Sequence, residues 1–309
     1  ARAPELDYRN EVEYRELPCR TLISSVQSAR VPFQFAINPY RGCEFGCVYC
    51  YARYTHEYLE LRDWLDFERR VFVKQGAREA LINDLRRRDF RGKWIAIGTA
   101  TDPYQPAERR YRLTRSLLEV FAGRRNLRLC ITTKSDLIRR DVDLLARIAE
   151  HSDLSVNVTI TTPLYPLARR IEPRAPRPER RLLAVKTLAD AGIRVGVFLM
   201  PLLPRINDRS EDLDLLFCLA KEAGAQYAAT QVLFLRSCSK RTFFPFIEER
   251  FPELLPYYQR LYAGYRTEAL TAYTRAKTAE VQELKRRHRL ESLRWETEHA
   301  PDQLALAGW

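Results

Sequence analysis

Asn38-Pro39-Tyr40-Arg41-Gly42-Cys43-Glu44-Phe45-Gly46-Cys47-Val48-Tyr49-Cys50-Tyr51-Ala52 is the stretch from which the rest of this chain can be interpreted. Three of the seven cysteines, Cys43, Cys47 and Cys50, fall here with three and then two residues between them. Cysteine thiolates are the usual ligands of iron–sulfur clusters, and a fully protein-ligated [4Fe–4S] cluster needs four of them. Three cysteines without a nearby fourth would leave one iron open to bind and activate a small molecule.

A structural zinc site is the main alternative, because C-x2-C is also a common zinc spacing. Zinc would need a fourth ligand, and the nearest candidates are His56 and the distant Cys19, without a second C-x2-C. The ligand count therefore favours the iron–sulfur cluster over zinc or unligated thiols.

Composition and charge limit the class of protein. The chain has 309 residues, a length that one α/β barrel domain can reach. No apolar run is long enough to span a membrane, and the polar segment 1–20 lacks the apolar centre of a signal peptide. An odd number of cysteines, three of them clustered, indicates a reducing compartment, so we expect a cytoplasmic protein.

The net charge is +12, from 52 Lys and Arg against 40 Asp and Glu. Such a surplus favours an anionic partner such as nucleic acid, through phosphate contacts and counterion release. A genome of high GC content encodes arginine often and would produce the same surplus without any anionic partner. Charge alone therefore leaves nucleic-acid binding open.

Apolar runs and helical patterns alternate along residues 33–235, as a parallel sheet with crossover helices requires. In such barrels the loops after the strands build the active site. A further extended stretch is predicted over 67–74. The predicted strands are 33–38, 94–99, 127–132, 154–160, 194–200 and 227–235, and the predicted helices are 77–88, 113–122, 142–150, 179–191 and 211–223.

The two ends of the chain differ from this middle part. Residues 1–30 are predicted to form an N-terminal extension across the core. Residues 237–309 are predicted to form a helical cap over the open side of the barrel, with a long charged helix over 272–298. Aromatic and basic residues interleave there, which allows a base-stacking surface, although ordinary helix packing is the more usual reason. These residues are Tyr257, Tyr258, Tyr262 and Tyr265 with Arg260 and Arg266.

Several motifs resemble one known family, the spore photoproduct lyase-like branch of the radical S-adenosylmethionine (SAM) enzymes, in its subgroup of uncharacterised bacterial members. The likeness covers residues 33–236, the part we expect to form the barrel domain, 31–236. The motifs are G-C-x3-C-x-Y-C-Y (42–51), T-D-P-Y-Q-P (101–106), T-T-K-S (132–135), T-I-T-T (159–162) with E-P-x-x-P (172–176), and P-x-x-P-x-x-N-D (201–208).

The resemblance implies an α/β fold, a partial (β/α)6 TIM-type radical SAM barrel. It implies an enzyme that cleaves SAM reductively at a [4Fe–4S] cluster to a 5′-deoxyadenosyl radical, which abstracts hydrogen from a substrate. It also implies an electron donor such as flavodoxin or ferredoxin. DNA is the first substrate to consider, with photoproduct repair as one version.

The resemblance also implies roles for single residues. Cys43, Cys47 and Cys50 would hold the cluster, and Tyr51 matches a tyrosine that helps return hydrogen to the product radical. Tyr104, in the 101–106 turn, is a further catalytic candidate. The residues that would contact SAM are Tyr49, Thr101, Asp102, Lys134 and Thr159.

One departure from the family pattern bears on the substrate. The repair lyase carries a hydrogen-donor cysteine where this chain has Thr99 or Ala100. Cys130 and Cys218 fall inside a predicted strand and helix, where free cysteines usually pack as core thiols. Cys238, just after the sixth strand, is the remaining candidate that could face the cavity.

Three hypotheses therefore remain open. The chain is a radical SAM enzyme acting on nucleic acid, one acting on a peptide or small molecule, or a non-catalytic iron–sulfur protein that binds nucleic acid or senses redox state. The sequence leaves the oligomeric state and the hydrogen that is abstracted undetermined.

Overall fold

Six parallel strands and one antiparallel edge strand form the central sheet of the computed structural model, which describes residues 12–28, 31–264 and 267–292. The strand order is β10-β9-β8-β7-β6-β3-β2, and the edge strand β2 (Ile23–Ser25) pairs antiparallel with β3. The parallel strands are β3 (Phe35–Ile37), β6 (Trp94–Ile97), β7 (Arg128–Thr133), β8 (Asp153–Thr159), β9 (Val195–Leu202) and β10 (Tyr227–Val232). All six predicted strands are confirmed.

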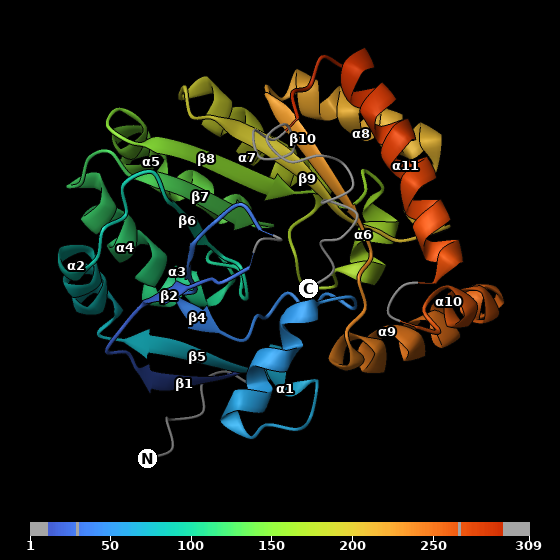
Figure 1. The fold of residues 1–309 in the computed structure, drawn as a ribbon, viewed down its shortest axis with the longest axis horizontal. Helices are drawn as coiled ribbons and strands as arrows, with labels where there is room; N and C mark the ends of the chain where they lie inside the picture. The colour runs from blue at the N-terminus through green and yellow to red at the C-terminus, as the bar shows by residue number, and fades with distance from the viewer. Residues whose placement is uncertain (1–11, 29–30, 265–266, 293–309) are drawn as a thin grey trace.

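The predicted crossover helices are also present, and Figure 1 shows them arranged around the outside of the sheet. They pack on it because their apolar residues recur at helical spacing: Leu118, Leu145 and Val185 are fully buried with Ile131 and Val156 of the strands in one core cluster. The helices are α2 (Ala77–Arg87), α4 (Leu113–Ala122), α5 (Val142–Ala149), α7 (Pro178–Asp190) and α8 (Ser210–Glu222).

β10 and β2 lie at opposite ends of the sheet order, so the sheet is an open, partial (β/α)6 barrel and not a closed one. Short helices occupy several connections that follow its strands, where the site is built. These are η1 (Tyr51–Leu59), α1 (Asp66–Arg69), α3 (Ala107–Tyr111), η2 (Asp136–Asp141) and α6 (Tyr165–Ile171).

A second sheet of three strands lies beside the barrel, and the sequence patterns did not predict it. β5 (Arg70–Gln75) pairs in parallel with β1 (Glu13–Pro18) and antiparallel with β4 (Tyr40–Arg41). Part of the predicted N-terminal extension is therefore strand. The extended stretch predicted over 67–74 is only partly right, because its first residues belong to the helical turn α1.

The C-terminal region is helical, as predicted. It contains α9 (Ser237–Arg250), η3 (Pro252–Leu254), α10 (Leu255–Leu261) and α11 (Glu268–Arg287), and Figure 1 places α9 and α10 together at one end of the molecule. α11 packs on α8 and β10 through the buried Val281 and Leu284.

The helix predicted over 272–298 ends earlier than its charge pattern suggested. Its last residue is Arg287, and Glu291 then pairs with Tyr227 at the edge of β10, where the Ala228 N–H donates to the Glu291 carbonyl at 3.2 Å. Residues 293–298 lie outside the described residues. Among the residues that the structure describes, none of the helices is long and apolar enough to cross a membrane.

Candidate functional site

The cysteine loop follows β4 and is held against the chain that leads into β5. The Cys43 N–H donates to the Phe67 carbonyl at 2.8 Å. Gly42 has a φ of +88°, and a Cβ there would lie 2.7 Å from the Arg70 carbonyl oxygen. Only glycine allows so close an approach at this positive φ.

The turn after β6 fixes the other side of the loop through hydrogen bonds with buried partners. The Gln105 side chain accepts from the Glu44 N–H at 3.0 Å and donates to the Gly42 carbonyl at 3.0 Å. Thr101 also donates to the Gly42 carbonyl, at 2.5 Å, and the Glu44 carboxylate accepts from the Ala107 N–H at 2.7 Å. The 101–106 motif therefore supports the cysteine loop, and the Thr101 hydroxyl is already used in doing so.

The three cysteine thiols lie close enough to influence one another electrostatically. Burial raises the pKa of Cys47 to about 12 and raises the pKa of Cys43 and Cys50 above the usual thiol value. Thiolates in such surroundings need a positively charged partner, and binding to a metal centre removes the thiol proton. The donor set therefore fits an iron–sulfur cluster.

Within residues 12–28, 31–264 and 267–292, no three His, Cys, Asp or Glu side chains converge as ligands of a single ion. A zinc ion would draw its ligands to within about 2.3 Å of one point, whereas each cysteine of a cluster binds a different iron. The number of cysteines remains the reason to favour a cluster over zinc.

Arg53 ties the cysteine loop to the chain after η1, and the sequence reasoning missed it. Its guanidinium, 2% exposed, donates to the Cys47 carbonyl at 3.1 Å and to the Trp64 carbonyl at 2.7 Å. It also pairs with the Glu68 carboxylate at 2.7 Å. The buried guanidinium of Arg53 thus joins the cysteine loop, at Cys47, to the chain after η1, at Trp64 and Glu68.

A buried charged network lies beside the cysteines. Glu172 and Arg181 form an ion pair at 2.6 Å with both side chains buried, and the Tyr49 hydroxyl donates to Glu172. The Lys134 ammonium lies 5.7 Å from the centroid of the Tyr49 ring. Tyr49 and Lys134 are predicted site residues that the fold brings together, whereas Glu172 was noticed only as part of a motif and Arg181 was not singled out.

The network controls the charges of its members. Burial alone would lower the pKa of Lys134, but the Cys47 thiol and the Glu172 and Asp102 carboxylates outweigh it and raise that pKa. Burial alone would raise the pKa of Glu172, but Arg181 and Lys134 outweigh it and lower that pKa. Lys134 is therefore a cation beside the cysteines.

Asp102 follows β6 and Thr159 ends β8, the two strands on either side of β7. The Asp102 carboxylate accepts from the Thr133 hydroxyl at 2.6 Å and from the Lys134 N–H at 2.7 Å, so it positions the end of β7 and the residue that carries the ammonium. The Thr159 side chain is buried, and its carbonyl accepts from Arg181 at 3.0 Å.

Tyr51 links elements from opposite parts of the sheet. Its hydroxyl donates to the carbonyl of Thr99, after β6, and its own carbonyl accepts from the Cys238 thiol at 3.6 Å, at the start of α9 after β10. Cys238 is 1% exposed, while Tyr51 is 37% exposed. Tyr51 and Cys238, two of the three predicted catalytic residues, therefore adjoin the cysteine loop. Cys218 is not a core thiol, because it is partly exposed and its thiol bonds Glu222.

Tyr104 lies on another side of the loop. Its ring is 1% exposed, and burial together with Asp141 and Glu108 raises the pKa of its hydroxyl. It lines a cavity of about 410 Å³ that Phe45 and four exposed arginines share. These are Arg109, Arg174, Arg177 and Arg180.

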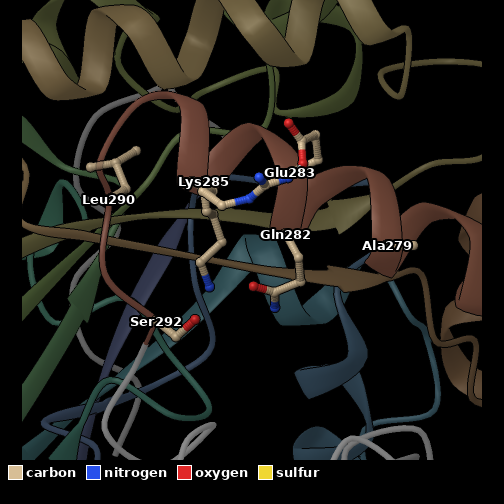
Figure 2. Close-up of a pocket in the computed structure, with 7 residues that line it drawn as sticks. Ala279, Gln282, Glu283, Lys285, Leu290 and Ser292 are labelled. Carbon is tan, nitrogen blue, oxygen red and sulfur yellow. Dashed lines mark ion pairs between the residues drawn. The ribbon is translucent and has the colours of Figure 1, made fainter.

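A second cavity, of about 510 Å³, lies along the end of α11. Figure 2 shows Gln282 and Lys285 projecting from the same side of that helix, with Ser292 below them. None of the predicted site residues lines this cavity.

Comparison with known proteins agrees with this site. The model of the Radical SAM superfamily matches residues 37–216. An uncharacterized protein of Mycobacterium tuberculosis is 36% identical over 262 residues, which are 84% of this chain and 76% of that protein. An uncharacterized protein of Methanocaldococcus jannaschii is 34% identical over 175 residues, 57% of this chain and 62% of that protein.

Solved structures of spore photoproduct lyase share the fold. One mutant superposes with a TM-score of 0.67 at 18% identity, over 94% of this chain and 85% of that chain. Another mutant, with bound AdoMet and dinucleoside spore photoproduct, gives a TM-score of 0.58 at 18% identity, over 82% and 72%. At this identity the likeness concerns the fold.

Proposed function

Because the chain belongs to the radical SAM superfamily, whose enzymes use a [4Fe–4S] cluster and SAM, we propose that it abstracts hydrogen from a nucleic acid. Photoproduct-lyase-like repair of DNA is the specific version. The observation that carries the proposal is the group of three thiols beside the Lys134, Glu172 and Tyr49 network.

In this proposal Cys43, Cys47 and Cys50 hold the cluster and leave one iron for SAM. The cluster and SAM, when bound, supply a 5′-deoxyadenosyl radical. Lys134 carries a positive charge next to the cysteines, which suits the carboxylate of the methionyl group. Burial of the surrounding side chains excludes water, which protects a reactive species from side reactions.

Tyr51 and Cys238 are the proposed residues for returning hydrogen to the product. Both have an O–H or S–H bond, and the Cys238 thiol contacts the backbone of Tyr51. The position of the family's donor cysteine falls at Thr99 or Ala100, neither of which has a sulfur, so Cys238 is the candidate that remains.

A nucleic acid is supported as the substrate by two observations. The chain carries a net charge of +12, which favours polyanions. It also shares its fold with an enzyme that has been crystallised with a dinucleoside photoproduct.

The test is anaerobic. The reconstituted protein is reduced with SAM present, and 5′-deoxyadenosine is measured with and without UV-irradiated DNA. We expect deoxyadenosine in both samples and loss of the DNA photoproduct in the second. The Cys43→Ala variant is expected to form none.

Other outcomes separate the parts of the proposal. If deoxyadenosine forms while the DNA stays unchanged, the DNA-repair hypothesis is wrong, and a peptide or small molecule becomes the substrate to test. A loaded cluster that never cleaves SAM with any reductant would contradict the radical chemistry itself.

A further inference from the structure

Exposed aromatic side chains gather next to the cysteine loop. Among the residues that the structure describes, the large hydrophobic side chains that are exposed include Tyr51, Tyr58 and Leu65, which all fall within residues 51–65. Tyr58 is the most exposed of these, at 74%. Exposed apolar groups concentrated in this way mark an interaction surface.

Two arginines from the C-terminal region lie over this aromatic segment. The guanidinium of Arg236 is 4.6 Å from the centroid of the Tyr54 ring, and that of Arg241 is 4.6 Å from the centroid of Trp64. The Tyr58 ring meets the Tyr54 ring edge to face, with centroids 6.2 Å apart. We call Tyr54, Tyr58, Trp64, Arg236 and Arg241 the η1 platform.

The platform is held rigidly at the edge of the site. Arg53 bonds the Trp64 carbonyl, so the position of Trp64 is fixed relative to Cys47. The α9 helix that carries Arg241 is anchored on the cysteine loop, because Ser239 donates to the Cys50 carbonyl at 3.2 Å. Tyr51 begins η1, which carries Tyr54 and Tyr58, and its hydroxyl donates to the Thr99 carbonyl after β6.

The chemistry of the platform matches unpaired nucleotides. Aromatic rings and guanidinium planes stack on bases whatever their sequence, and arginines also bind the phosphates between them. In the C-terminal aromatic run, Tyr258 and Tyr262 are buried in helix packing. Tyr257 is half-buried, with the Arg205 guanidinium 4.0 Å from its ring centroid, and Tyr265 lies outside the described residues.

We propose that the η1 platform binds unpaired nucleotides of a single-stranded or locally opened nucleic acid and leads them to Tyr51. This inference rests on the proposed function, because it assigns the substrate surface of the same site. Glu57 is exposed on η1 and opposes the binding of phosphates.

Binding is measured with the cluster-loaded protein and a labelled single strand of about ten nucleotides. We expect Tyr54→Leu combined with Tyr58→Ser to weaken binding about 100-fold, since each of the two lost stacks contributes roughly ten-fold. Arg236→Gln with Arg241→Gln should reduce the salt dependence, lowering the slope of log K against log salt by about 1.4. Glu57→Gln should tighten binding.

Arg128→Gln is the matched control, because its guanidinium also stacks on an aromatic ring, 4.4 Å from the centroid of Trp94, at the amino-terminal end of β6 and β7. It should leave oligonucleotide binding unchanged. Equal losses in the control and the platform variants would overturn the inference, as would wild-type protein that fails to bind the strand or binds an acidic peptide equally well.

SAM cleavage without nucleic acid keeps this test separate from the proposed function. The platform variants are expected to retain the cluster and to form deoxyadenosine at the wild-type rate while they lose binding. If wild-type protein cleaves SAM but does not bind the strand, the platform inference fails alone. If it binds the strand but never cleaves SAM, the proposed radical chemistry fails alone.

Discussion

At the scale of single residues, buried charges and not the cysteines alone determine the shape of the site. Arg53 is the clearest case, because one guanidinium joins the Cys47 carbonyl, the Trp64 carbonyl and the Glu68 carboxylate. Removing one member of a buried ion pair is costly, because the other charge is left without its partner.

Arg53→Met should therefore destabilise the protein by about 3–5 kcal/mol, because Glu68 and two carbonyls lose their partner. Urea unfolding measures the change. Arg91→Met is the control, since Arg91 is an exposed residue paired with Asp89 and its loss should leave stability unchanged. An equal change in the free energy of unfolding of the two variants would contradict the stabilising role of Arg53.

His56 predicts a pH dependence of stability. Its ring packs edge-on against Phe67 and Phe72, and burial lowers its pKa, although the Arg70 carbonyl and Asp66 oppose this. The unfolded chain therefore binds the proton more readily than the folded protein. Stability is complete above the unfolded histidine pKa of about 6.5, and it decreases by up to about 1.4 kcal/mol per pH unit below that.

Unfolding free energies measured in urea between neutral and mildly acidic pH check this prediction. His56→Gln should flatten the slope on the acidic side. An unchanged slope in the variant would assign the titration to another group.

At the scale of elements, the turn after β6 acts as a clamp on the cysteine loop. The loop has little regular structure of its own, so its shape depends on the Gln105 side chain, which bonds its backbone, and on its own Glu44 carboxylate, which accepts from the Ala107 N–H. The charged network supplies a second support, because the Val48 N–H donates to the carbonyl of Ile171, next to Glu172.

Gln105→Met keeps the volume of the side chain but leaves the Glu44 N–H without its acceptor. A buried group that loses its partner destabilises by about 1–3 kcal/mol, so we expect that loss and faster release of iron to a chelator. Gln282→Met, at an exposed position of α11, should change neither quantity. Iron release at the wild-type rate in Gln105→Met would contradict the clamp.

At the scale of the whole molecule, the site joins elements from distant parts of the sheet. Tyr51 contacts the chain after β6 and the start of α9, while Lys134 and Glu172 come from the ends of β7 and α6. A ligand bound among them should therefore stabilise the whole barrel.

Anaerobic protein with its cluster should gain about 2.7 kcal/mol in unfolding free energy at a SAM concentration 100-fold above the dissociation constant. The Cys43→Ala variant, which lacks one cluster ligand, should show a much smaller gain. Chemical unfolding with and without SAM measures both. Equal gains in the two proteins would show that SAM binds independently of the cluster.

The sequence by itself determined the six parallel strands, the crossover helices and the cysteine loop. These features depend on residues close in the chain, and apolar periodicity and cysteine spacing report such local features directly. The second sheet was missed because the pairing of β1 with β5 joins segments that carry no local sign of each other.

Only the tertiary structure decided the partners within the site. Tyr49 and Glu172 are 123 residues apart in the chain. Arg236, which lies over Tyr54, follows β10 at one end of the sheet order. Motifs predicted that Tyr49 and Lys134 belong to the site, but gave no sign that Glu172 and Arg181 would form an ion pair beside them. Contacts of this kind follow from the order and twist of the strands, which place distant segments together without leaving a repeating pattern in either one.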